Sequence, residues 1–220
     1  MKRFLLYITF SFFAITILHA QSDGNSKNSS FFIQPEILLG KTIPANSNFP
    51  KTEIQRIFSL SFGNFVQDTS RTWSVFYNYP SVGVSVSYTN FGDNEVFGNA
   101  YSLVPFISIS TSKKQYGNFY FKLGLGASYF TTYFNEESNP NNIAIGSAIT
   151  WTFESTIHYN VFVTPITSLS IGGGFIHHSN GHTQLPNAGL NSVLFSVASR
   201  FYLKPLTDQQ LNGIEKPTKK

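Results

Sequence analysis

The sequence predicts an all-β protein, an eight-stranded antiparallel transmembrane β-barrel of the outer-membrane type. Three observations lead to this prediction. Apolar residues recur at every second position through most of the chain, which is the period of a β-strand. The positions between them carry mainly Ser, Thr and Gly, and a pattern of apolar side chains alternating with small polar ones is typical of transmembrane barrels. Charged residues make up 12% of the chain, about half the roughly 25% of ordinary soluble domains.

The N-terminus has the organisation of a secretory signal peptide. Lys2 and Arg3 precede an apolar run that ends at Leu18, and Ala20 supplies the small residue expected at a cleavage site. The run is shorter than the roughly 20 apolar residues that a membrane-spanning helix needs. We therefore expect residues 1–20 to be a signal peptide that is removed on export.

Composition and charge exclude several classes of protein. The absence of Cys from an exported chain excludes disulfides as a source of stability. The formal charge of +4 falls to +2 without Lys2 and Arg3, which is too small to indicate a nucleic-acid partner.

We interpret residues 21–205 as a single barrel domain. Residues 206–220 form a polar C-terminal tail that we expect to be disordered in the periplasm.

The alternation divides the chain into eight strand-like segments. In the sixth, one face is almost wholly apolar, and we interpret Glu154 and His158 on the other face as part of a polar network in the lumen. The third segment contains Pro80, whose missing N–H predicts a bulge or a break. The expected strands lie near residues 31–42, 53–64, 70–90, 98–111, 117–131, 144–163, 167–179 and 190–203.

The connections indicate how the barrel is oriented. Those after the second, fourth and sixth segments are expected to be short, near Gln67-Asp68, Lys113-Lys114 and Thr164-Pro165. Those after the odd-numbered segments are longer and rich in Asn, Pro and Gly. Outer-membrane barrels have short periplasmic turns and longer outer loops. We therefore expect the seventh strand to run outward and to end at the outer leaflet.

Polar side chains with catalytic potential gather between Phe175 and Asn191. On the seventh strand His177 and Ser179 share the parity of the apolar, lipid-facing residues, whereas His178 has the parity of the lumen. Asn191 has the lipid-facing parity of the eighth strand, and a hairpin would bring it beside Ser179. Because packing against lipid gives no reason for these three polar side chains, they are candidates for function.

These residue types suit nucleophilic catalysis. A Ser hydroxyl is a weak nucleophile unless a base takes its proton, and a base works best when a third group fixes its tautomer. His177 can be the base for Ser179, because side chains two positions apart on a strand lie on the same face. The side chain or N–H of Asn180, together with the N–H of Gly181, is predicted to hold a developing oxyanion.

The motif His-x-Ser-Asn at residues 177–180, followed by Asn-x-Gly-x-Asn at residues 187–191, resembles the PagL-type lipid A 3-O-deacylases. The resemblance is sharpest over this stretch, and the barrel pattern extends it to most of the chain. It implies an eight-stranded outer-membrane barrel that removes an ester-linked hydroxyacyl chain from lipid A without a cofactor. It also implies that His177 is the base, Ser179 the nucleophile and Asn180 part of the oxyanion site.

One position departs from the family. The best-studied pattern has a Glu about twelve residues after the Ser, where this chain has Asn191. An Asn can orient a His, so we predict that Asn191 orients His177, although an amide does not stabilise an imidazolium by charge. The alternative is that Glu136 or Glu137, from an outer loop, takes the place of the missing carboxylate.

The resulting hypothesis is a membrane-embedded serine esterase whose partner is lipid A, or lipopolysaccharide, in the outer leaflet of the bacterial outer membrane. Two alternatives remain open. One is a non-catalytic small barrel with a structural or adhesion role, and the other is a phospholipase that uses the same site. His177, His178 and His182 could instead bind a metal ion, but the first two point to opposite faces and no Cys or nearby carboxylate completes the set.

Overall fold

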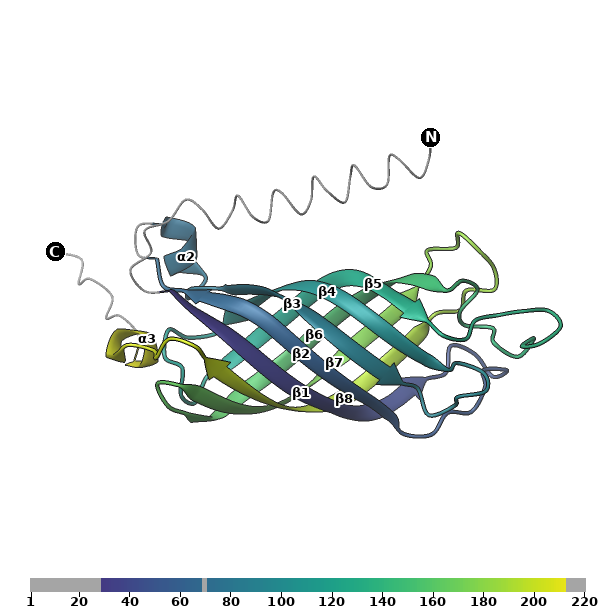
Figure 1. The fold of residues 1–220 in the computed structure, drawn as a ribbon, viewed down its shortest axis with the longest axis horizontal. Coiled ribbons are helices and arrows are strands. Elements are labelled where there is room, and N and C mark those ends of the chain that lie inside the picture. The colour runs from purple at the N-terminus through teal and green to yellow at the C-terminus, as the bar shows by residue number, and fades with distance from the viewer. Residues whose placement is uncertain (1–28, 69–70, 213–220) are drawn as a thin grey trace.

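The computed structural model describes residues 29–68 and 71–212. The expected signal peptide of residues 1–20 lies outside the described residues. Eight antiparallel strands form a closed barrel in which neighbours in sequence are paired and β1 pairs with β8 (Figure 1). The predicted fold class is thus confirmed. The strands are β1 (Ser29–Ile43), β2 (Gln55–Val66), β3 (Ser81–Asn90), β4 (Asn99–Ser110), β5 (Phe119–Phe130), β6 (Ile149–Val163), β7 (Thr167–Ser179) and β8 (Leu190–Tyr202).

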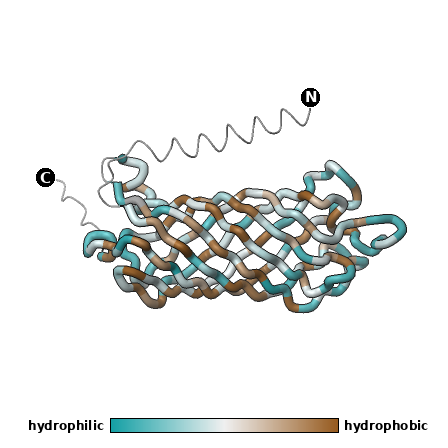
Figure 2. Tube along the Cα trace, viewed as in Figure 1, coloured by the Kyte–Doolittle hydropathy of each residue, from teal (hydrophilic) through white to brown (hydrophobic). Residues whose placement is uncertain are grey.

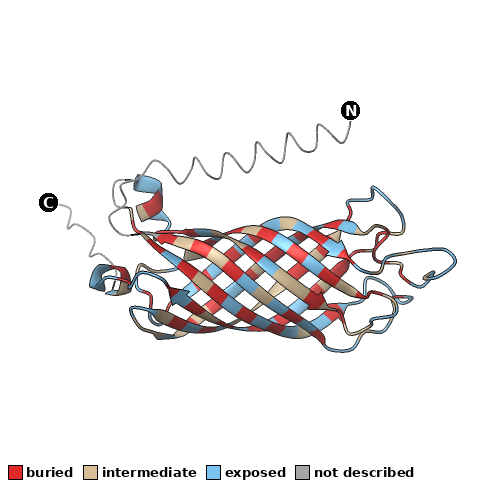
Figure 3. Cartoon of the chain, in the orientation of Figure 1, coloured by how far each residue is buried: buried red, intermediate tan, exposed pale blue. Residues whose placement is uncertain are grey.

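The exposure of the side chains follows the alternation of residue types. In β5, Phe119, Phe121 and Leu123 are exposed, whereas Tyr120 and Lys122 between them are buried. Figure 3 shows buried and exposed positions alternating along the strands, and Figure 2 shows apolar residues distributed along the barrel. A closed sheet pairs every strand edge, and an exposed apolar wall suits the interior of a bilayer.

Among the described residues, the helices are all too short or too polar to cross a membrane.

The third strand is shorter than expected. It was expected over residues 70–90, but β3 begins at Ser81, and the short helix α2 (Thr72–Phe76) lies before it. Asn78 and Tyr79 turn the chain with φ values of 56° and 60°, and Pro80, which has no N–H to donate to the ladder, ends the turn. The predicted break at Pro80 therefore marks the start of the strand and not a bulge within it.

The sixth strand also begins later than expected, at Ile149 in place of residue 144. Ala144 and Ile145 are fully buried in an apolar cluster at the end of the barrel that carries the β1–β2, β3–β4, β5–β6 and β7–β8 connections, here called the outer end. This outer cluster consists of Phe49, Phe91, Phe97, Ala100, Phe130, Ala144, Ile145 and Leu190. The connections at the outer end therefore form a packed cap.

The opposite, inner end is closed by α2 and by the chain after β8, which lie at the same end of the barrel in Figure 1. The β2–β3 connection was expected to be short but spans residues 67–80, because it contains α2. Val75 of α2 and Leu211 pack against an inner cluster of buried apolar residues. These are Phe32, Phe65, Tyr79, Phe106, Tyr202 and Leu206.

The expectation of a disordered tail is wrong for residues 206–212. Leu206 is buried in the inner cluster, and helix α3 (Asp208–Asn212) follows it. The N–H of Gln115 donates to the carbonyl oxygen of Leu211 at 3.0 Å, which joins the tail to the β4–β5 connection. Residues 213–220 lie outside the described residues.

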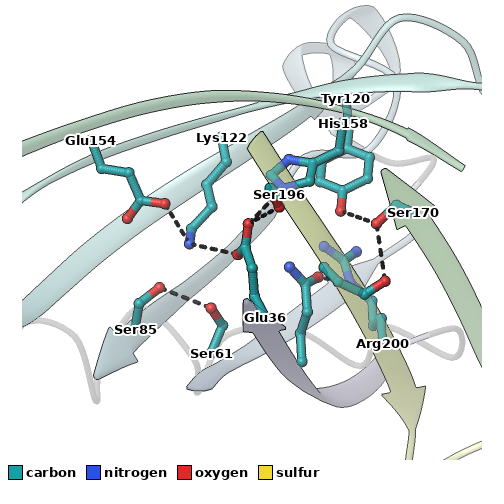
Figure 4. Close-up of polar contacts among 12 residues, drawn as sticks. Glu36, Ser61, Ser85, Tyr120, Lys122, Glu154, His158, Ser170, Ser196 and Arg200 are labelled. Carbon is teal, nitrogen blue, oxygen red and sulfur yellow. Dashed lines mark hydrogen bonds and ion pairs between the residues drawn. The ribbon is translucent and has the colours of Figure 1, made fainter. Parts of the chain in front are cut away.

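A network of buried charges crosses the lumen (Figure 4). Nζ of Lys122 lies 2.8 Å from Oε1 of Glu154 and 3.9 Å from Oε2 of Glu36. Nε2 of His158 lies 2.8 Å from Oε1 of Glu36, to which the hydroxyl of Ser196 also donates. Glu154 and His158 thus belong to one lumen network, as predicted, but Lys122 and Glu36 connect them.

Replacing Lys122 by Met should destabilise the barrel by about 3 kcal/mol, because it leaves two buried carboxylates without their cation. Unfolding by guanidinium in detergent micelles, followed by tryptophan fluorescence, measures the change in the free energy of unfolding. Lys114→Met is the control, since Lys114 is exposed in the β4–β5 connection. A Lys122→Met barrel as stable as this control would show that the network contributes little.

Candidate active site at the outer end of β7 and β8

The predicted catalytic residues lie at the outer end of β7 and β8, where His177 is hydrogen-bonded to Asn191 and Ser179 to residues of the β7–β8 connection. His177 is paired with Asn191 in the β7–β8 ladder, and Ser179 with Trp151 in the β6–β7 ladder. His177, Ser179 and Asn191 are partly exposed, whereas His178 is buried inside the barrel with 1% of its surface exposed. The two adjacent histidines therefore point to opposite faces of the barrel wall, as strand parity predicts.

A hydrogen bond fixes the imidazole of His177. Its Nδ1 lies 2.7 Å from Oδ1 of Asn191. An amide oxygen accepts hydrogen bonds and does not donate them, so Nδ1 carries the hydrogen, and in the neutral imidazole Nε2 then has the lone pair. This is the tautomer that a general base needs. Gly189 leaves room for the ring, because a Cβ at this position would lie 3.0 Å from Cε1 of His177.

The hydroxyl of Ser179 accepts hydrogen bonds from two donors of the β7–β8 connection. Nδ2 of Asn187 lies 2.8 Å from Oγ of Ser179, and the N–H of Gly181 donates to the same atom at 3.1 Å. Gly181 has a φ of 66°, a conformation that glycine adopts without strain. With both acceptor positions of Oγ occupied, the hydroxyl hydrogen is left to be donated to a base.

The surroundings of Asn180 differ from the expectation. Its side chain is buried, and Nδ2 donates to the carbonyl oxygen of Gln184 at 2.7 Å and to Oγ of Ser147 at 3.3 Å. Its backbone N–H donates to Oδ1 of Asn187 at 3.1 Å. Both donors that Asn180 was expected to offer an oxyanion are therefore engaged within the protein. Its contacts instead hold the connection in shape.

Asn187 is a candidate functional residue to which the sequence analysis assigned no role. Its amide joins two parts of the site, since Nδ2 donates to Ser179 and Oδ1 accepts from Asn180. The available signal was its place at the start of the Asn-x-Gly-x-Asn segment. Strand parity says nothing about a residue in a connection, so the direction of this side chain could not be derived.

Glu136 and Glu137 were the alternative partners for the imidazole of His177. Asn191, however, is the residue that is hydrogen-bonded to Nδ1 of His177. Both glutamates are exposed in the β5–β6 connection.

As for metal binding, no group of three or more His, Cys, Asp or Glu side chains suited to a metal ion occurs within residues 29–68 and 71–212.

Comparisons with known proteins identify the relatives of this chain. The family model described as "Lipid A 3-O-deacylase (PagL)" matches residues 61–200. The crystal structure of the outer membrane enzyme PagL is similar, with a TM-score of 0.55 and 15% sequence identity, and the match covers 75% of this chain and 97% of that chain. Among curated proteins, none matches this chain.

Two other outer-membrane barrels are more distant. Neisserial surface protein A (NspA) matches with a TM-score of 0.48 and 13% identity, over 79% of this chain and 97% of that chain. The N-terminal β-barrel domain of Pseudomonas aeruginosa OprF matches with a TM-score of 0.43 and 14% identity, over 77% of this chain and 97% of that chain.

The family match extends over more than half of the chain, from within β2 to within β8, and it includes His177, Ser179 and Asn191. The likeness to the PagL crystal structure shows that the two proteins share the barrel fold. The chain is a β-barrel of the bacterial outer membrane and belongs to the lipid A 3-O-deacylase (PagL) family.

Proposed function

We propose that this protein is a serine esterase that removes an ester-linked hydroxyacyl chain from lipid A in the outer leaflet. The observation that carries the proposal is the hydrogen bond of 2.7 Å between His177 and Asn191, beside Ser179 on the outer wall of the barrel. His177, with the Nδ1 hydrogen that a general base needs, and Ser179 thus lie on the same lipid-facing side of the barrel wall. The name of the family supports the choice of lipid A as substrate.

The proposed reaction uses these residues in turn. Oγ of Ser179 attacks the ester carbonyl while its hydrogen passes to Nε2 of His177, and Asn191 keeps the imidazolium in place through Nδ1–H. The same hydrogen then passes from Nε2 to the sugar oxygen that leaves, and the acyl group stays on Ser179. Water deprotonated by His177 hydrolyses this acyl-enzyme and releases the hydroxy fatty acid.

Gly181 and Asn187 are better placed than Asn180 to hold the oxyanion. In the resting site both donate to Oγ of Ser179, at 3.1 and 2.8 Å. The carbonyl oxygen of a substrate under attack lies next to this Oγ, so a small shift carries both donors to the developing charge. Preorganised donors of this kind stabilise the transition state of acyl transfer.

The wall beside the site supports a lipid substrate. Trp151 is paired with Ser179 and Phe153 with His177, and both aromatic side chains are exposed on β6. Further along β7, Gly173 has the same parity as His177 and Ser179 but presents no side chain. An acyl chain that enters sideways from the membrane can lie along this apolar wall without leaving the bilayer.

The tautomer of His177 can be measured without an activity assay. In protein labelled with ¹⁵N at histidine, the resonances of the neutral His177 imidazole should show a protonated Nδ1 and an unprotonated Nε2. Asn191→Leu should abolish this preference and give a mixture of tautomers, because Nδ1 loses its acceptor. His182, which is exposed, serves as the internal reference. A protonated Nε2 in the wild-type protein would contradict the proposed base.

Ser179→Ala should abolish deacylation. Mass spectrometry of lipid A from cells that express the wild-type protein should show the loss of one hydroxyacyl chain, and cells with the variant or without the protein should retain it. Purified protein is tested in parallel on phosphatidylethanolamine vesicles, where release of fatty acid would indicate a phospholipase. Identical lipid A in all three strains would favour the non-catalytic barrel.

Asn187→Ala should lower kcat for lipid A by roughly 100- to 1,000-fold, as expected when one oxyanion donor is removed. Gln184→Ala is the matched control, because Gln184 lies in the same connection, is exposed, and contacts Asn180 through its backbone carbonyl. Heat-modifiable migration in gels would confirm that both variants fold. Equal activity of the two variants would assign the oxyanion to other donors.

A further inference from the structure

A shallow cleft, wide open to solvent, lies between the connections of the outer end, next to the candidate active site. Its volume is about 700 Å³, and the residues that line it come from the β1–β2, β5–β6 and β7–β8 connections. Asn187 connects the cleft with the candidate active site, since it lines the cleft and donates to Oγ of Ser179 at 2.8 Å. The proposed acyl transfer uses this amide but assigns no role to the rest of the cleft.

The walls of the cleft are held in place. The N–H groups of Ala188 and Gly189 donate to the carbonyl oxygens of Ile143 and Ala144, at 3.1 and 3.0 Å, and so join the β7–β8 connection to the β5–β6 connection. The β1–β2 connection is anchored by Phe49, which is buried in the outer cluster. The cleft is therefore built on the packed cap and can be preorganised for a ligand.

The position of the cleft selects the part of the substrate that reaches it. The ester must lie at Ser179, where β7 ends, and the acyl chain lies along the apolar wall towards the membrane. The part of a glycolipid on the other side of the ester is its polar head, which extends away from the bilayer. That head meets the connections of the outer end, where Asn187 lines the cleft.

The lining suits a sugar ring. Phe134 and Leu185 line the cleft, and apolar side chains of this kind can pack against the C–H face of a saccharide. Asn46 and Asn48 supply amides that can donate to and accept from hydroxyl groups, and Glu136 can accept from a hydroxyl or an amino group. Among the described residues that line the cleft there is no Lys or Arg, so it does not match a phosphate group.

We propose that this cleft binds the saccharide of the outer-leaflet glycolipid, at a subsite distinct from the acyl ester. The bound sugar places the ester at Ser179, and the cleft selects a glycolipid over a phospholipid. The role of the sugar in catalysis rests on the proposed esterase function, whereas the binding itself does not.

Binding is tested with Ser179→Ala protein in detergent micelles and fully deacylated lipopolysaccharide, a soluble saccharide without acyl chains, by isothermal titration calorimetry. Adding Phe134→Ala or, separately, Asn48→Ala should weaken binding about tenfold. Glu137→Gln is the control, since Glu137 is exposed in the same connection but does not line the cleft. Enzymatic removal of the phosphates should leave the affinity within about twofold, as expected for a ligand change of under half a kcal/mol.

The saccharide subsite is refuted if the deacylated lipopolysaccharide does not bind, if both cleft variants bind as the Glu137→Gln control does, or if dephosphorylation abolishes binding. The last result would show recognition of phosphate in place of sugar.

A second measurement separates this inference from the proposed function. With Ser179 intact, Phe134→Ala should lower kcat/KM for lipid A about tenfold and leave hydrolysis of a sugar-free ester of the same hydroxyacyl chain unchanged. Equal losses on both esters would overturn the subsite. If the wild-type protein hydrolyses neither ester, the proposed esterase fails, and the calorimetry still decides whether the cleft binds a saccharide.

Discussion

The need to satisfy every backbone N–H and C=O inside a bilayer determines the rest of this structure. A closed sheet meets it, because each strand is hydrogen-bonded on both edges and β8 returns to β1. Closure then gives each strand position one of two environments, lipid or lumen. Polar side chains on the lipid side are tolerated best near the rim of the barrel, and His177, Ser179 and Asn191 lie at the outer ends of β7 and β8.

Contacts inside the barrel hold the backbone of β7 in place next to the candidate base. His178 follows the candidate base directly in sequence but points inward, where its Nδ1 lies 3.1 Å from Oγ1 of Thr152 and the rings of Phe91 and Phe130 meet it edge-on. These contacts fix the backbone of β7 at the residue next to His177. Adjacent histidines thus have separate tasks, one as the proposed base and the other as packing inside the barrel.

The sequence was sufficient for features that depend on strand parity, and insufficient for those that depend on contacts between connections. Parity placed His177, Ser179 and Asn191 on the lipid face and Glu154 in the lumen. It could not reveal that α2 and the residues after β8 close the inner end, because both depend on the inner cluster. The direction of Asn187 and the cleft likewise depend on how three connections pack together, which no local pattern encodes.

The amide of Asn191 also changes the electrostatics of the rim. A carboxylate at this position would place a negative charge on the wall that faces lipid, where ionised side chains are costly. The neutral amide gives His177 the same acceptor without that charge. The group that orients His177 therefore adds no charge of its own to the lipid-facing wall.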